Sequence, residues 1–356
     1  MCVKARQGDG VVGHWGICTD GGSPPGVTAA PAGRYAGTRA VRTIHFRKLS
    51  RRYLDLELPA ADDVAVRIVE RPGLWMQQDE VTKMVEELRS VVAAVLDGRS
   101  LDYGVFTGEK QALDRAVVTL VYERSSGRPI AFNVLSLLRL TLRGGEVEVI
   151  HLGLAMVHPS HRGRGLSAVL YGLTCTLLFF RSQMRPIWVT NVSQVPSVIG
   201  LVAETLSNVY PSPDPRKHRS FDHLVIAREI MKHHRRAFGV GDEAGFDERR
   251  FVVTNAYTGG SDNLKKPFAA APPHRREVYN RMCKDELDYE VGDDFLQIGQ
   301  IDVAAARNFL LRNVPRAWLP SLLFRLMFLS VGSSLLPVLH WLSPGRPMGD
   351  LRPWKR

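Results

Sequence analysis

The sequence predicts an α/β fold in which helices flank a mixed, mainly antiparallel sheet and a helical extension follows at the C-terminal end. Three observations lead to this expectation. Apolar runs of strand length recur between residues 65 and 157, and apolar residues recur at helical spacing between residues 77 and 96. A strand, a glycine-rich loop, a helix and a further strand then follow one another between residues 147 and 192.

The composition is that of a globular protein with a basic surface. Of the 356 residues, 45% are hydrophobic and 23% are charged, which is ordinary for a chain with a packed core. The formal net charge of +11 favours an anionic partner: a nucleic acid, an anionic membrane surface or a phosphorylated cofactor. The four cysteines (Cys2, Cys18, Cys175 and Cys283) form no CxxC pair and have no histidine at zinc-ligand spacing, so we expect a cytoplasmic protein without a metal site.

The first part of the chain predicts a leader followed by regular elements. Residues 1–43 are rich in Gly, Pro, Ala and Arg, which predicts a disordered leader without the apolar core of a signal peptide. Residues 65–69 (AVRIV) alternate as a strand does, and residues 77–96 have the apolar spacing of an amphipathic helix. Residues 116–122 and 129–140 predict a hairpin around the turn ERSSGR, and residues 147–157 (VEVIHLGLAMV) predict a third antiparallel strand.

The elements after the loop alternate between helix and strand. Residues 168–180 predict a mostly buried helix, and residues 186–192 (PIWVTNV) predict a strand. Pro196 at a helix-starting position predicts a helix over residues 197–206, and regular patterning continues weakly over 221–230. We therefore expect a folded domain over residues 62–256 and a C-terminal extension over residues 257–356.

The loop VHPSHRGRGLS, residues 157–167, has the features of a phosphate site. The first N–H groups of a helix lack partners within the helix and point toward an anion. Gly163 and Gly165 let the backbone approach phosphate oxygens closely, and Arg162 or Arg164 adds a full positive charge to the helix dipole. Leu166 leads into the apolar helix, and the alternative interpretation is a plain glycine-rich turn.

These residues resemble the motif of the GNAT superfamily, the GCN5-related N-acetyltransferases. In that motif Arg or Gln is followed by two residues, Gly, one residue and Gly or Ala, just after a strand that ends in Val-x-Pro. Val157, His158 and Pro159, followed by Arg162, Gly165 and Ser167, stand at the matching offsets. Ser167 departs from the usual Gly or Ala, but its side chain is small. The resemblance covers residues 62–230 and includes the order of the elements around the loop.

The resemblance implies a co-substrate, which is acetyl-CoA or a longer acyl-CoA. Its pantetheine arm would pair with the backbone of Ala155, Met156 and Val157, and its pyrophosphate would bind the loop over residues 162–167. A backbone N–H of the same strand would polarise the thioester carbonyl. Asn191 would hydrogen-bond the arm or cap the helix that follows.

The catalytic side chains are less clearly indicated. Acyl transfer to an amine needs a base for the amine and benefits from an acid for the departing thiolate. Glu148 and His151 on the strand before the loop are the candidate bases. The family's usual acid is a tyrosine about seven residues after an asparagine. Seven residues after Asn191 this sequence has Val198. Tyr210 beyond that helix is then the candidate acid, whereas Tyr171 and Cys175 are expected to pack in the core.

Two further features concern possible partners. Basic clusters at residues 216–219, 232–236, 249–250 and 274–276 lack interleaved aromatic residues, which favours a solvated basic face over a nucleic-acid site. Residues 317–342 are largely apolar and carry a single charge, Arg325, but Pro320 and Pro337 make one straight spanning helix the least favoured alternative. Two short helices there would pack on the domain, close an acyl-binding channel, or lie with residues 343–356 at an anionic membrane surface.

Together these patterns predict an acyltransferase that moves an acyl group, acetyl by first expectation, from acyl-CoA to an amine by direct attack in a ternary complex. The expected location is the cytoplasm, with peripheral membrane attachment if residues 317–356 bind a membrane. The alternatives are a non-catalytic acyl-CoA-binding or sensing protein and a membrane-attached scaffold.

Overall fold

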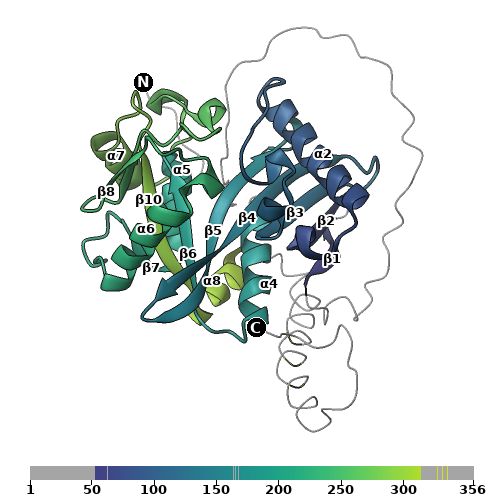
Figure 1. The fold of residues 1–356 in the computed structure, drawn as a ribbon, viewed down its shortest axis with the longest axis horizontal. Coiled ribbons are helices and arrows are strands. Elements are labelled where there is room, and N and C mark those ends of the chain that lie inside the picture. Colours follow the sequence, from purple (N-terminus) through teal and green to yellow (C-terminus); the bar gives the residue numbers. More distant parts are fainter. Residues whose placement is uncertain are drawn as a thin grey trace, which may run out of the picture.

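The structure, a computed structural model, describes residues 53–61, 63–162, 164, 166 and 168–313, together with the single residues 327, 331 and 335. Ten strands form one mixed, mainly antiparallel sheet flanked by helices, which confirms the predicted fold class (Figure 1). The strand order is β1-β2-β3-β4-β5-β6-β10-β9-β8, and β7 pairs with β10 beside this path. The predicted leader over residues 1–43 lies outside the described residues.

The first half of the sheet is an antiparallel meander, in which each strand pairs with the next along the chain. Its strands are β1 (Asp55–Ala61), β2 (Val64–Glu70), β3 (Ala116–Glu123), β4 (Pro129–Leu142) and β5 (Gly145–Val157). Between β2 and β3 lie α1 (Pro72–Trp75), α2 (Gln78–Val95), the 3-10 helix η2 (Gly104–Thr107) and α3 (Lys110–Leu113). The predicted hairpin, third strand and amphipathic helix are therefore present, whereas β1, α1 and α3 were not predicted.

The second half of the sheet joins segments that are far apart in sequence. Its strands are β6 (Ile187–Ser193), β7 (Ser207–Tyr210), β8 (Gly245–Asp247), β9 (Val252–Thr254) and β10 (Asp294–Ile301). Its helices are α4 (Thr174–Arg181), α5 (Pro196–Thr205), α6 (Phe221–His233), α7 (Glu277–Glu286) and α8 (Val303–Asn313). Because β10 lies between β6 and β9, residues on both sides of the expected boundary at residue 257 belong to one sheet.

The helix expected over residues 168–180 begins with a π-helical segment, η4 (Ala168–Leu173), which continues as α4. The carbonyl of Leu170 accepts a hydrogen bond from Nδ2 of Asn133 on β4 at 2.7 Å. This bond gives the carbonyl a partner outside the helix. The Oδ1 atom of the same buried asparagine has no partner among the described residues.

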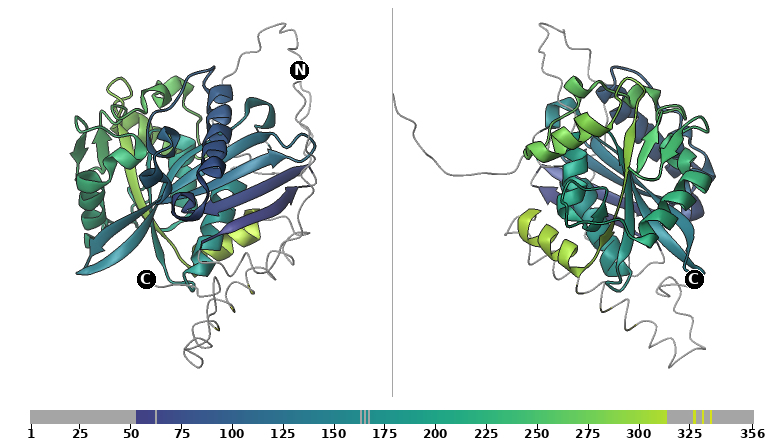
Figure 2. Two further views of the ribbon diagram at one scale, coloured as in Figure 1. Left: turned by 45° about the vertical axis from the view of Figure 1, so that its right-hand side comes forward. Right: turned by 90° about the vertical axis from the view of Figure 1, so that its left-hand side faces the viewer.

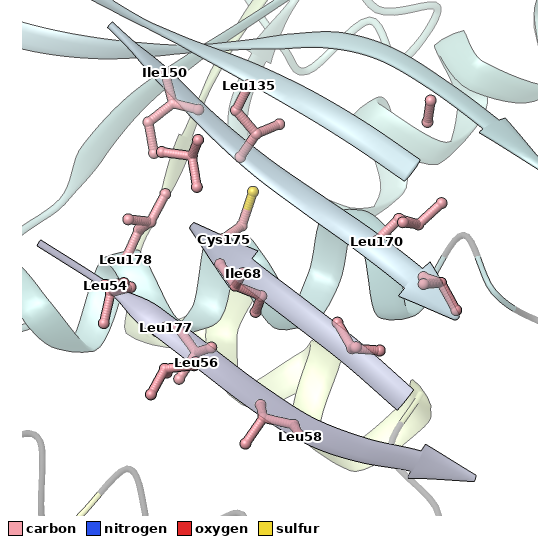
Figure 3. Close-up of a cluster of buried hydrophobic side chains, with 14 of the residues drawn as sticks. Leu54, Leu56, Leu58, Ile68, Leu135, Ile150, Leu170, Cys175, Leu177 and Leu178 are labelled. Atoms are coloured by element: carbon pink, nitrogen blue, oxygen red, sulfur yellow. The ribbon is translucent and has the colours of Figure 1, made fainter. Parts of the chain in front are cut away.

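Helices cover both faces of the sheet (Figure 2). Alternate residues in the middle of β4 face opposite sides. Val134 and Leu138 pack with apolar residues of α2 and α6, respectively, whereas Leu135 and Leu137 pack with α4. Side chains from β1, β2 and α4, including Leu56, Ile68 and Leu177, gather in one buried cluster (Figure 3). We call the sides that carry α2 and α4 the α2 face and the α4 face; α6 lies on the α2 face.

The predicted apolar segment over residues 317–342 lies outside the described residues except for Met327, Val331 and Leu335, which are exposed. None of the described helices is long and apolar enough to cross a membrane. Just before that segment, α8 packs against η4, where the Phe309 ring stands in the space that a side chain on Gly172 would need.

Candidate functional site

The sheet splits between its two central strands. β5 and β6 pair in parallel only at Ile150↔Val189, His151↔Thr190 and Leu152↔Asn191. Beyond this point β5 continues along β4 as far as Val157, and β6 continues along β10 as far as Ser193. Residues 153–157 of β5 therefore have no strand partner on the β6 side among the described residues, and a strand edge of this kind presents its N–H and C=O groups to a ligand.

A β-bulge shapes β5 at the start of this free edge. The β4–β5 register moves by one residue between the pairs Leu135↔Leu152 and Asn133↔Ala155. The bulge reverses the alternation: His151 before it and Met156 after it both face the α2 side, although their positions differ by five, an odd number that would place them on opposite faces of a regular strand.

Gly153 makes the bulge possible. A Cβ atom at this position would lie 2.3 Å from the carbonyl oxygen of Val134, so only glycine lets the two strands approach this closely. The hydroxyl of Tyr171 on η4 donates a hydrogen bond to the Gly153 carbonyl at 2.6 Å. The bulge is thus fixed from β4 on one side and from the helix after the loop on the other.

A cavity of about 1040 Å³ opens at the split. Five of the residues predicted to bind the cofactor line it: Ala155, Met156, Val157, Arg162 and Asn191. They come from β5, from the loop after it and from β6, so the fold brings together side chains that the sequence only places in order. Asn191 is buried and donates to Oε1 of Gln297 at 3.5 Å.

The remaining predicted cofactor residues lie elsewhere or outside the described residues. Arg162 is half-buried and has no carboxylate partner in the described part of the chain. Arg164, in contrast, pairs with Asp63 and does not line the cavity. Leu166 is buried in the apolar cluster on the α4 face. Gly163, Gly165 and Ser167 lie outside the described residues.

Of the three predicted catalytic residues, only His151 lines the cavity. Its Nδ1 lies 3.0 Å from the Thr190 hydroxyl, and its ring stacks on Phe238 with centroids 4.5 Å apart. Burial lowers the pKa of His151 to about 3, so its imidazole is neutral near pH 7. A neutral imidazole with so low a pKa is a hydrogen-bonding group and a weak base.

Glu148 and Tyr210 lie away from the cavity lining. Glu148 is exposed, and its carboxylate forms an ion pair with Arg71. The Tyr210 hydroxyl donates to the carbonyl of Arg249 at 3.2 Å, and its ring packs edge-on against Phe251. Both side chains are therefore engaged with other parts of the protein.

The two residues on the loop's helix that were expected to pack in the core differ from each other. Cys175 belongs to the apolar cluster on the α4 face, and burial raises the pKa of its thiol to about 12. Tyr171 packs against the same cluster but also lines the cavity, where its hydroxyl holds Gly153.

Asp294 and Tyr257 form a second polar pair at the cavity that the sequence did not indicate. Asp294 is the first residue of β10 and is 4% exposed. The Tyr257 hydroxyl donates to Oδ1 of Asp294 at 3.0 Å, whereas Oδ2 of Asp294 has no hydrogen-bond partner among the described residues. Burial raises the pKa of Asp294 to about 7, against the opposing effect of the Tyr257 hydrogen bond. The only sequence signal is a pair of aspartates directly before an apolar strand.

The charged residues that line the cavity are mainly basic. The carboxylates are Asp97, Glu109 and Asp294. The arginines and lysines are Arg99, Arg115, Arg162, Arg236, Lys265, Lys266 and Arg275. This excess of positive charge favours an anionic ligand. Within the described residues no group of three or more His, Cys, Asp and Glu side chains is arranged to hold a metal ion.

Comparisons with known proteins give little beyond this geometry. No protein-family model and no curated protein matches the chain. Among solved structures, the ribosomal-protein-S5-alanine acetyltransferase from Vibrio fischeri is similar to it, with 12% sequence identity and a TM-score of 0.30. That similarity covers 42% of this chain and 81% of the other. With values this low, only the chemistry of the site bears on function.

Proposed function

We propose that the protein is a GNAT-type N-acyltransferase that moves an acyl group from acyl-CoA to an amine by direct attack in a ternary complex. The observation that carries this proposal is the split between β5 and β6, with a cavity at the free edge of β5. The same strand leads directly into the loop whose motif resembles the GNAT phosphate loop.

The donor would bind along the β5 edge. The amides of its pantetheine arm would pair with the backbone over residues 155–157, which have no strand partner on that side among the described residues. The pyrophosphate would then reach the loop at residues 162–167 and the N-terminal end of the following helix. Arg162 lines the cavity without a carboxylate partner among the described residues, so its guanidinium is available for a phosphate.

The acceptor would approach from the side of Asp294. The neutral amine nitrogen attacks the thioester carbonyl carbon, a C–N bond forms and the C–S bond breaks. The proton lost by the amine passes to Oδ2 of Asp294 and is then available to the departing thiolate. A carboxylate with a pKa near 7 suits this exchange at neutral pH, because it takes up and releases a proton with little cost in either direction.

His151 is assigned a different part, because its low pKa makes it a poor proton acceptor. Its neutral ring would hydrogen-bond a bound group in the cavity. Glu148 and Tyr210 are left out of the proposed chemistry, since Glu148 pairs with Arg71 and neither residue lines the cavity.

Two measurements test the proposal. Calorimetric titration with CoA should show binding, and Arg162→Ala should weaken it by about tenfold, the value of one lost charge-assisted hydrogen bond. Arg164→Ala is the matched comparison and should have a smaller effect, because Arg164 is engaged with Asp63. Absence of CoA binding by the wild-type protein would refute the proposed function.

Turnover separates the enzyme from the second candidate, a non-catalytic acyl-CoA sensor. The position of Tyr210 outside the cavity favours that candidate, because the tyrosine predicted as the acid is then not at the cavity to protonate the departing thiolate. An acyltransferase should release free thiol from acetyl-CoA in the presence of some member of a panel of amines. CoA binding without thiol release above background would favour the sensor.

A further inference from the structure

Part of the cavity lining, on the α2 face of the sheet, is an apolar wall. We call this the apolar wall and define it by six lining residues: Leu96, Val105, Phe106, Val134, Leu154 and Met156. All six belong to the apolar cluster between α2, η2 and the strands β4 and β5 or pack against it. Five of them are buried, with Leu154 partly exposed.

Neighbouring rings hold this wall in place. Phe106 lies edge-on to Phe132 of β4 and to Tyr103, in each case with ring centroids 5.7 Å apart. Val134 lies on β4 directly opposite the bulge at Gly153, and Met156 follows the bulge on β5. The wall is therefore built on the sheet and on packed aromatic residues, and it does not depend on a bound molecule for its shape.

Polar side chains also line the cavity. Tyr257, Ser261, Asn263, Lys265 and Asp294 line it. An amine that gives its proton to Asp294 must lie beside that carboxylate, which is not one of the residues of the apolar wall. The pantetheine arm follows the β5 edge, so the group that remains to be placed is the acyl chain.

An acetyl group is too small to use this wall. A cavity of about 1040 Å³ is at the upper end of the size that takes up a whole drug-like ligand. An acetyl group adds one methyl beyond the thioester carbonyl and would reach only a small part of this lining. Apolar surface of this kind is stabilised by an apolar ligand and poorly by water.

We propose that the apolar wall binds the acyl chain of the donor and that the protein prefers acyl-CoA with a chain of several methylenes over acetyl-CoA. This inference rests on the proposed acyl-CoA site, because the same β5 edge has to hold the pantetheine arm.

Calorimetric titration with CoA, acetyl-CoA, hexanoyl-CoA and decanoyl-CoA tests the inference. Each methylene that moves from water to the apolar wall should strengthen binding by up to about fourfold. Hexanoyl-CoA has four more methylenes than acetyl-CoA, so the wild-type protein should bind it on the order of 100-fold more tightly.

Variants then place the chain within the cavity. Val134→Phe fills part of the space beside the wall and should reduce the hexanoyl-to-acetyl ratio to less than about tenfold. Leu154→Phe should act in the same direction and serves as the second variant if Val134→Phe does not fold. Leu74→Phe is the matched control, because Leu74 is 47% exposed and does not line the cavity, and it should leave the ratio unchanged.

Each outcome is decisive. Equal affinity for CoA and all three acyl-CoAs would overturn the acyl-chain site while leaving the proposed CoA site intact. A rise with chain length that both filling variants preserve would overturn the placement of the chain at the apolar wall. No binding of CoA or of any acyl-CoA would overturn the proposed function and this inference with it.

Discussion

Replacing Gly153 with alanine should disrupt the bulge in β5. The added Cβ would stand 2.3 Å from the Val134 carbonyl oxygen, about 1 Å closer than carbon and oxygen atoms normally approach. Neither group can rotate away, because both belong to the paired backbones of β4 and β5. The strands would have to separate at the point where β5 leaves β6.

Two opposing effects determine how much Gly153→Ala changes the free energy of unfolding. Overpacking of this kind costs about 3 kcal/mol at the upper end of its usual range. The alanine also lowers the conformational entropy of the unfolded chain, which stabilises the folded state by up to about 1 kcal/mol. We therefore expect Gly153→Ala to lower the free energy of unfolding by about 2 kcal/mol.

Gly145→Ala on the same strand is the matched control. A Cβ atom there would have the Leu142 carbonyl oxygen at 3.8 Å as its nearest neighbour, an ordinary contact. This variant should keep its stability or gain up to about 1 kcal/mol. Urea unfolding followed by circular dichroism measures both variants, and titration with CoA should show weaker binding for Gly153→Ala alone. Equal unfolding free energies for the two variants would refute the close approach at the bulge.

Three further predictions concern hydrogen bonds and titrating groups. Tyr171→Phe removes the donor to the Gly153 carbonyl and should lower the free energy of unfolding by about 1–3 kcal/mol. The hydrogen bond of the Tyr210 hydroxyl is longer and exposed, so Tyr210→Phe should lower the free energy of unfolding by less than about 1 kcal/mol. Similar losses for the two variants in urea unfolding would contradict this ranking. Because the folded-state pKa of Asp294 is raised to about 7, the folded protein keeps a proton on this residue that the unfolded chain loses near pH 4. The contribution of Asp294 to stability is therefore present below pH 4 and is lost as the pH rises to 7. Asp294→Asn should remove this loss, and parallel curves of unfolding free energy against pH for the wild type and the variant would argue against it. The Cys175 thiol is buried and its pKa is raised to about 12, so it should resist alkylation by iodoacetamide at pH 8 until the protein is unfolded. Rapid alkylation of Cys175 in the native protein, measured by peptide mass spectrometry, would rule out its burial.

Local patterns account for the elements that the sequence predicts correctly. The helix that became α2 and the strands that became β3, β4 and β5 each have a continuous apolar periodicity, and near neighbours in sequence pair with one another. The order of strand, loop and helix around Arg162 is local in the same way. Its resemblance to a phosphate loop therefore needs no knowledge of distant residues.

The strand β10 shows where this reasoning stops. Its residues, 294–301, have apolar character, but nothing in them indicates pairing with β6 about 100 residues earlier, since strand pairing depends on the whole sheet. For the same reason the sequence placed residues 257–356 in an extension, although β10 completes the sheet between β6 and β9.

In the candidate site, too, some residues follow from local sequence and others are placed by long-range packing. The sequence by itself indicated four residues that line the cavity, because Ala155, Met156, Val157 and Arg162 are consecutive or nearly so and their strand and loop form locally. Only the tertiary structure decided which side chains face them. The bulge at Gly153 sets the face of each β5 residue, the split from β6 opens the cavity, and β10 brings in Asp294 from far along the chain. These placements follow from long-range packing, and a single sequence read along its length does not contain them.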